Sequence, residues 1–277
     1  MRSSISTCEN SRRAVSPRNL SSLMPANQTT SEAVILVKAS PHVGKKHGET
    51  VCCAAVTDDG QWLRLYPITF RSLDEAKQFK RWDRIRFRWE KPSDDPRPES
   101  TRVDHQSIEI IGELKKKDRL SFLNRIEVNS IKKVQAEGKS FALLRPRNLR
   151  FSIEKKADKK FNAEKADFTN FTAQTDLFTK PLMPLEPCPY EFKYKYETDD
   201  GDREGTCQDW ETDATFYKWA KDYGEEKALK EMQRVFGEEY PKKGMVFAMG
   251  THSLYPETWL INGIIRLDEI TQLSLDL

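Results

Sequence analysis

The segment that constrains the fold most, residues 51–71, has the pattern of a β-hairpin. An apolar run is followed by Asp59-Gly60 and then by a run of alternating character. An Asp-Gly turn between two such runs is one of the strongest short-range hairpin signals. Because side chains alternate along a strand, one face of the second arm is expected to present Trp62, Arg64 and Tyr66. Aromatic rings beside a guanidinium can stack on a flat ligand and hold an anion.

The strand predicted at residues 82–89 extends this pattern. Its arginines alternate with apolar residues, so Arg84, Arg86 and Arg88 are expected on one outer face. Guanidinium groups suit phosphates, and aromatic planes suit bases. The alternative is that the aromatic residues belong to the core and the arginines solubilise an outer face. Under the first interpretation, the nucleic-acid-binding residues are Lys46, Trp62, Arg64, Tyr66, Arg71, Arg84 and Arg86.

Composition limits the class of protein. The chain has 277 residues, of which 37% are hydrophobic and 32% charged, and its 10% aromatic content is enough to build a core. No apolar run approaches the roughly 20 residues that a membrane-spanning helix requires. The cysteines number five and include no Cys-x-x-Cys pair, which favours reduced thiols in a cytoplasmic protein. No metal-ligand spacing is present, so we expect no cofactor.

Charge is distributed unevenly along the chain. Residues 61–165 carry an excess of Lys and Arg, and residues 190–277 an excess of Asp and Glu. Such asymmetry points to a surface for polyanions or to two halves that attract each other. We therefore expect an α+β protein with a disordered tail or overcalled start at 1–32, a β-rich basic module at 33–155, a charged linker at 156–180 and a smaller acidic α+β part at 181–277.

The remaining elements follow from periodicity and turn residues. Residues 72–80 have helical spacing with Ser72 as N-cap, and residues 209–236 form the longest predicted helix, with a break at Gly224. Residues 198–206 have the composition of an acidic loop. Strands are expected at 33–39, 108–112, 141–144, 149–153, 190–196, 245–249 and 259–267, and a further helix at 120–137.

Three polar residues are candidates for catalysis. Asp209 and Glu211 begin the long predicted helix, where carboxylates can bind Mg²⁺ or act as acid and base. Residues two apart do not share a helix face, so capping by Asp209 is the simpler explanation. His252 follows a Gly-Thr turn at a strand end, where it can serve a ligand or a proton transfer, or be a loop histidine with ordinary partners. Mg²⁺ is expected only if these residues form a hydrolase site.

Several motifs together resemble a scattered family of uncharacterised bacterial proteins. They are GETVC, WLRLYPITFR, RPES, DWE and GTHSLYPETW, and the resemblance covers most of the chain after Ala33. Members of that family tend to carry a Cys- and His-containing turn before DWE, whereas this chain retains only Cys207 there, so the metal implied by the resemblance is not expected here. The N-terminal part also resembles the PUA and ASCH β-barrels, which implies recognition of RNA or of a modified base.

Three functions remain open at this stage. The first is nucleic-acid binding, to RNA, DNA or modified or foreign nucleic acid, through the aromatic and basic face. The second is a metal-dependent hydrolase or nuclease that uses Asp209, Glu211 and His252. The third is a protein–protein interaction module whose acidic part docks on a basic partner. The sequence does not distinguish DNA from RNA and does not indicate an oligomeric state.

Overall fold

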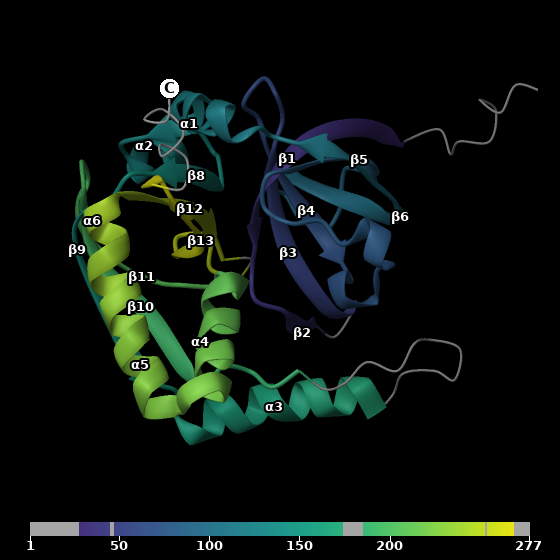
Figure 1. Ribbon diagram of the computed structural model, residues 1–277. Helices are drawn as coiled ribbons and strands as arrows, with labels where there is room; N and C mark the ends of the chain where they lie inside the picture. The colour runs from purple at the N-terminus through teal and green to yellow at the C-terminus, as the bar shows by residue number, and fades with distance from the viewer. Residues whose placement is uncertain (1–27, 45–46, 174–184, 253, 269–277) are drawn as a thin grey trace, which may run out of the picture.

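The computed structural model describes residues 28–44, 47–173, 185–252 and 254–268. Most of the expected tail and Lys46 lie outside this part of the chain. The protein is α+β, with an N-terminal part of strands and a C-terminal part in which helices cover two further sheets (Figure 1). Among the described helices, none is long and apolar enough to cross a membrane.

The N-terminal sheet has six strands in the order β1-β5-β6-β4-β3-β2. β1 also pairs with β3, so the pairings of five strands run in a ring. The predicted hairpin is confirmed, since β3 and β4 pair antiparallel with Val56 opposite Trp62. The strand bounds are Thr29–Lys38 (β1), His42–Gly44 (β2), Gly48–Val56 (β3), Trp62–Ile68 (β4), Asp83–Glu90 (β5) and Ser100–Glu113 (β6).

Strand β1 is buried on both faces, which explains its unbroken apolar run. Ala33 and Ile35 face the core inside the six-stranded sheet, whereas Val34 and Leu36 face a second core shared with the C-terminal part. All four side chains have no exposed surface. Full burial of one large aliphatic side chain contributes about 1.5–3 kcal/mol to the free energy of unfolding. Because β1 contributes to both cores, it stabilises the contact between the two parts.

The C-terminal part contains a three-stranded sheet, β11-β10-β9, and a four-stranded sheet, β13-β12-β8-β7. Strands β7 to β9 therefore belong to the C-terminal part. That part begins earlier in the chain than the boundary expected near residue 155. The strand bounds are Glu127–Val128 (β7), Phe141–Leu144 (β8), Arg147–Lys155 (β9), Tyr190–Thr198 (β10), Gly201–Thr206 (β11), Met245–Thr251 (β12) and Trp259–Arg266 (β13).

The long predicted helix and its break are confirmed. The side chain of Asp209 caps α4 by accepting a hydrogen bond from the backbone of Glu211 at 3.0 Å. Gly224, at φ 88°, separates α4 from α5 in a conformation that glycine adopts most readily. The helix bounds are Lys116–Ile126 (α1), Ile131–Ala136 (α2), Asp158–Ala173 (α3), Trp210–Tyr223 (α4), Glu225–Arg234 (α5) and Tyr240–Lys243 (α6), with a π-helical turn at Val235–Glu239.

Four local expectations need correction. Residues 72–80 form no α-helix; two 3₁₀ turns, Phe70–Ser72 and Glu75–Lys77, take that place. The expected helix at 120–137 is divided into α1 and α2 by the short strand β7, which pairs with β8. The acidic loop is a hairpin, because Gly201, at φ 101°, turns the chain so that β11 pairs with β10. The charged segment at 156–180 contains α3.

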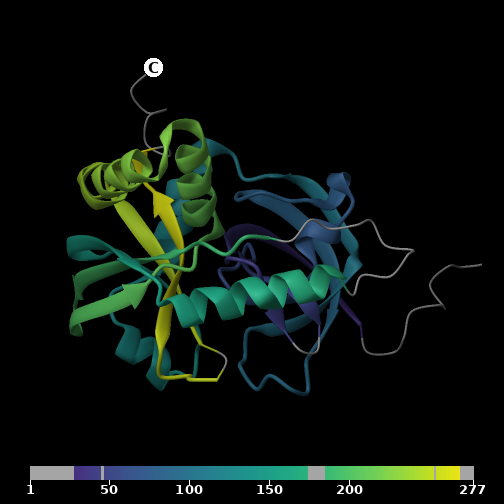
Figure 2. The same ribbon diagram turned by 90° about the horizontal axis from the view of Figure 1, so that it is seen from below.

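Helix α3 connects the two parts in space. It starts next to the C-terminal sheets and runs to β2 and β3 of the N-terminal part, as both views show (Figure 1 and Figure 2). Its Phe171 ring lies against Gly48, where a Cβ atom would approach the ring to 2.3 Å. The helix therefore closes one side of the space between the two parts.

Candidate functional site

A cavity of about 1200 Å³ lies between the two parts of the molecule. The N-terminal part contributes β3, β4 and the loop before β6, and the C-terminal part contributes α3, α4 and the segment after β12. The residues used below all line this cavity: Ser40, Cys52, Arg64, Tyr66, Asp95, Arg97, Gln208, Trp210, Asp213, Tyr217, Thr251, His252, Leu254 and Asn262.

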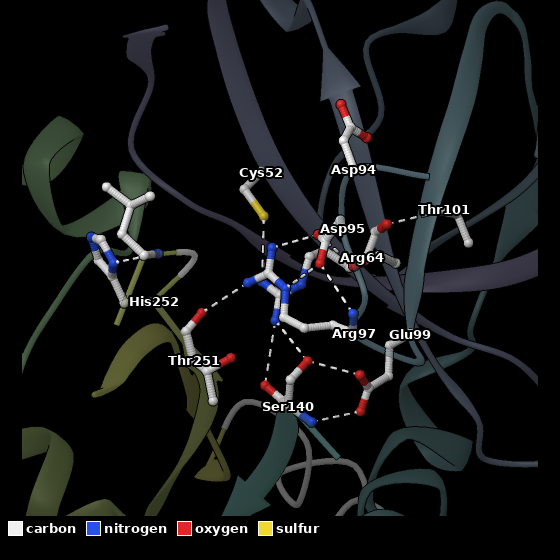
Figure 3. Close-up of polar contacts among 12 residues, drawn as sticks. Cys52, Arg64, Asp94, Asp95, Arg97, Glu99, Thr101, Ser140, Thr251 and His252 are labelled. Carbon is white, nitrogen blue, oxygen red and sulfur yellow. Dashed lines mark hydrogen bonds and ion pairs between the residues drawn. The ribbon is translucent and has the colours of Figure 1, made fainter. Parts of the chain in front are cut away.

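The central feature of the cavity is the guanidinium group of Arg64. The side chain is 4% exposed and lies over the Phe141 ring, with 4.0 Å between the guanidinium carbon and the ring centre. Its Nη2 donates to the hydroxyl and the backbone carbonyl of Ser140, at 3.0 and 3.3 Å. Its Nη1 has a long contact, 3.8 Å, with the Cys52 sulfur (Figure 3). Arg64 thus reaches from β4 to the start of β8 in the other part.

The charge of Arg64 is incompletely satisfied. Its Nε is buried without a hydrogen-bond partner among the described residues, and no carboxylate of those residues lies within ion-pair distance. Glu99 reaches it only through Ser140, whose hydroxyl donates to Glu99 at 2.7 Å. Burial lowers the pKa of Arg64 because the charged form is desolvated. A buried cation with a vacant donor favours an anionic or strongly polar ligand.

A second arginine beside Arg64 is fully paired. Arg97 donates to both oxygens of Asp95, at 2.8 and 2.6 Å, and to the backbone carbonyl of Thr251 at 3.2 Å (Figure 3). Burial alone would raise the pKa of Asp95, but the hydrogen bonds from Arg97 and Ser100 outweigh it and lower that pKa to about 2. The RPES motif, residues 97–100, therefore builds the floor of the cavity and leaves Arg64 as its unneutralised cation.

Aromatic side chains form part of the cavity wall. Tyr66 stands edge-on to His47, with ring centres 5.6 Å apart, and Trp210 stands edge-on to Phe70 at the same spacing. The hydroxyl of Tyr217 donates to the backbone carbonyl of Pro187 at 2.7 Å, which fixes that ring in the wall. Fixed aromatic planes of this kind can pack against a flat ligand.

The wall also presents hydrogen-bonding groups. Gln208 and Asn262 supply amides, and Asp213 supplies a carboxyl that accepts a hydrogen bond from the Ser40 hydroxyl. Burial raises the pKa of Asp213 to about 6, although the Ser40 hydrogen bond opposes the shift. The hydroxyl oxygen of Thr251 is buried without a partner in the described structure. The cavity thus combines donors, acceptors and aromatic planes around one buried cation.

The structure distributes the predicted nucleic-acid-binding residues over several places. Arg64 and Tyr66 line the cavity, whereas Trp62 lies on the other side of Phe141, stacked on it at 5.1 Å, and lines a second cavity of about 760 Å³. Arg71 forms an ion pair with Glu49 at 2.7 Å outside both cavities.

The outer arginines of β5 are paired with carboxylates. Arg84 forms two hydrogen bonds with Asp58, at 2.7 and 2.8 Å, and Arg86 lies between Glu32 and Glu109, at 2.8 and 3.3 Å. Arg88 is paired with Asp104 at 2.6 Å. This face is a network of ion pairs, which leaves less charge for phosphates than the sequence pattern indicates.

The candidate catalytic residues do not converge. Asp209 is 2% exposed and its oxygens accept hydrogen bonds from the backbones of Glu211 and Ile264, whereas the side chain of Glu211 is 52% exposed. His252 alone of the three lines the cavity, and its Nδ1 accepts a hydrogen bond from the backbone of Leu254. Within the described ranges, no group of three or more His, Cys, Asp or Glu residues is arranged to bind a metal ion.

Several residues that shape the cavity are not indicated by the sequence. Ser140 and Asp213 bear no local signal, since each acquires its role from a partner far away in the chain: Arg64 lies 76 residues from Ser140, and Ser40 lies 173 residues from Asp213. The RPES motif is the nearest local signal, since it places Arg97 and Glu99 before β6, but it does not show that Arg97 pairs with Asp95 or that Glu99 accepts from Ser140.

Comparison with known proteins shows the family but assigns no activity. Residues 125–276 match the family described as domain of unknown function DUF8757, and residues 29–128 match domain of unknown function DUF8758. No curated protein matches the chain. A chain from a structure titled "Structure and Conformational Change of a Replication Protein A Heterotrimer Bound to ssDNA" is similar over 91% of this chain and 69% of that one, at 9% identity and a TM-score of 0.23. Similarity at that level carries no argument here.

Proposed function

We propose that this chain, which belongs to the family of the domain of unknown function DUF8757, binds nucleic acid by holding one nucleotide in the cavity between its two parts. The observation that carries this proposal is Arg64, a buried guanidinium with a vacant Nε and no carboxylate partner in the described structure. A phosphate would supply the missing negative charge and accept from Nη1, whose contact with the Cys52 sulfur in the cavity wall is long, 3.8 Å.

The rest of the cavity supports a nucleotide over a simple anion. Its volume of about 1200 Å³ is far larger than a phosphate needs, since ligand pockets for small molecules span about 300–1,000 Å³. Tyr66, Trp210 and Tyr217 offer planes for a base, and Gln208 and Asn262 offer donors and acceptors for its edge. A nucleotide extruded from a strand would place phosphate, sugar and base against these three kinds of wall.

The arginines on the outer face of β5 are less suited to bind a phosphate than Arg64 in the cavity. Arg84 and Arg86 are already paired with carboxylates at hydrogen-bond distance. A phosphate that bound there would have to displace those carboxylates, whereas a phosphate at Arg64 displaces none. We therefore propose Arg64 and Tyr66 as contact residues and regard Arg84 and Arg86 as structural.

The test is a binding titration with matched variants. Fluorescence anisotropy would measure the affinity of the purified full chain for labelled single- and double-stranded DNA and RNA at low salt. We expect Arg64→Met to weaken binding by about tenfold or more, which corresponds to about 1.4 kcal/mol, and Arg84→Ala to leave it within about twofold.

Two controls make the result decisive. Thermal unfolding would verify that Arg64→Met remains folded, and Tyr66→Leu, at the same cavity, should also weaken binding without removing a charge. Absence of binding by the wild type to any of the four nucleic acids, or equal losses for Arg64→Met and Arg84→Ala, would contradict the proposal.

A further inference from the structure

Two adjacent apolar side chains are exposed next to the cavity. Leu254 is 76% exposed and Tyr255 is 64% exposed, and Tyr223, at 37%, is the one other large hydrophobic side chain exposed in the described part of the chain. Single exposed apolar residues are common on protein surfaces, but a neighbouring pair at the rim of a cavity is a feature that needs an explanation. Leu254 itself lines the cavity.

Backbone hydrogen bonds hold described residues on both sides of this pair. His252 donates its backbone N–H to the carbonyl of Thr258 at 2.9 Å, and Thr258 donates to the carbonyl of Tyr255 at 2.8 Å. Leu254 donates its backbone N–H to the Nδ1 of His252 at 3.1 Å. The rings of His252 and Tyr255 lie 5.1 Å apart. The two side chains therefore lie among residues that these contacts hold, after the end of β12 and before the start of β13.

The turn is also connected to the cavity floor. Thr251, at the end of β12, accepts a hydrogen bond from Arg97 through its carbonyl and donates its backbone N–H to the carbonyl of Ser140 at 3.0 Å. Ser140 in turn binds Arg64. One continuous set of contacts thus connects Leu254 and Tyr255 to the cation that we assign to the phosphate. Figure 3 shows two of these contacts, between Arg64 and Ser140 and between Arg97 and Thr251.

We propose that Leu254 and Tyr255 form a wedge that enters the base stack of a nucleic-acid duplex, at the gap left by the nucleotide held in the cavity. This inference rests on the proposed function and adds the way in which a paired nucleic acid would be bound. Proteins that extrude a base or kink a duplex insert apolar side chains between base steps, because an empty gap in the stack is unfavourable. A leucine and a tyrosine beside the mouth of the cavity match that requirement in chemistry and in position.

The test compares duplex and single-strand binding in one variant. The variant is Leu254→Ser with Tyr255→Ser, and the control is Tyr223→Ser, which removes an exposed aromatic residue outside the cavity lining. The probes are a labelled duplex with one unpaired nucleotide and a labelled trinucleotide, which has no stack to enter. We expect the variant to lose about tenfold in affinity for the duplex and to bind the trinucleotide within about twofold of wild type.

The outcomes separate this inference from the proposed function. Unchanged duplex binding by the variant would overturn the wedge while the binding function stands. Equal losses on duplex and trinucleotide would also overturn it, since the pair would then belong to the cavity wall. Failure of the wild type to bind either probe would overturn the proposed function, and with it the wedge; capture of a protein by the wild type but not by the variant in that case would assign the pair to a protein interface.

Discussion

Arg64 illustrates how one residue joins the two parts of the molecule. Its guanidinium rests on Phe141 and donates to Ser140, although both residues follow it by more than 70 positions. Ser140 in turn donates to Glu99 through its backbone and its hydroxyl, at 2.8 and 2.7 Å. Arg64, Ser140 and Glu99 therefore form one buried polar chain, in which the loss of one member leaves the others unpaired.

This chain of contacts predicts non-additive stability effects. Ser140→Ala should lower the free energy of unfolding by about 1–3 kcal/mol, because the buried Arg64 and Glu99 lose the hydroxyl that both contact and keep only their contacts with the backbone of residue 140. The double variant Arg64→Met, Ser140→Ala should lose clearly less than the sum of the single losses. Urea unfolding of the four proteins measures this cycle, and Ser121→Ala, an exposed serine in α1, is the control. Additive losses would show that the three residues are not coupled.

Asp213 predicts a pH dependence of stability. Its folded pKa, about 6, lies above that of an unfolded aspartate, about 3.9. As pH rises between these values, the unfolded chain releases its proton before the folded chain does, so this group's contribution to the free energy of unfolding falls and then levels off.

The variant Asp213→Asn removes that dependence. Relative to wild type, its free energy of unfolding should rise by up to about 2 kcal/mol from pH 4 to pH 7, less than the full shift would give because Asp213 keeps some contact with solvent. Chemical unfolding across this range measures the difference. A difference that stays constant with pH, or that changes in the opposite direction, would exclude the assigned pKa.

At the scale of elements, Asp209 fixes the start of α4 to two neighbours. Its Oδ1 caps the helix, while its Oδ2 accepts from the backbone of Ile264 in β13 at 2.8 Å and from Arg81, before β5, at 3.0 Å. The carboxylate thus holds a helix, a C-terminal strand and the N-terminal sheet together. This structural role accounts for its burial.

Replacement of Asp209 should therefore affect stability first. Asp209→Ala should lower the free energy of unfolding by about 3–5 kcal/mol, because two backbone donors lose their acceptor and the largely buried Arg81 loses one of its partners. Glu211→Ala, at the exposed partner of the same arginine, should cost about 0–1 kcal/mol. Thermal and urea unfolding give both values. Equal losses of stability in the two variants would show that the contacts of Asp209 with the start of α4 and with β13 contribute little to the free energy of unfolding.

Elements with strong local signals could be predicted from the sequence. The hairpin at β3 and β4 is set by its Asp-Gly turn, and the break between α4 and α5 is set by Gly224. Residues 72–80 have no such strong local signal. The spacing of Leu73 and Phe79 suited a helix, but the chain forms two short 3₁₀ turns that bury both side chains in the N-terminal core. Tertiary burial there outweighs local propensity.

At the scale of the whole molecule, the cavity could not be predicted because it exists only after distant segments meet. Tyr66 was expected at a binding surface, but its neighbours Trp210 and Asp213 lie on a helix more than 140 residues later. The acidic partners of the outer arginines could not be predicted either, since Glu32 precedes Arg86 by 54 residues. Sequence spacing identified the arginines but not whether their charge was already satisfied.

The pairing of the outer arginines predicts a shallow salt dependence. If a nucleic acid places one phosphate on Arg64, the one unneutralised cation among the described residues that line the cavity, the logarithm of the affinity should fall against the logarithm of salt concentration with a slope of about −1. Binding across the arginines of β5 would release more counterions. Titration of the wild type at several salt concentrations measures the slope, and a value of about −6 or steeper would indicate a broad electrostatic surface in place of the cavity.

The most direct test of the central claim is to locate the bound nucleotide. An oligonucleotide that carries one 5-iodouracil would be bound to the wild-type protein, cross-linked by light and mapped by mass spectrometry. A nucleotide in the cavity should cross-link to Tyr66, Trp210 or Tyr217, which line it. A cross-link at Trp62, which stacks on Phe141 and lines the second cavity, would contradict the account and move the binding site to that second cavity.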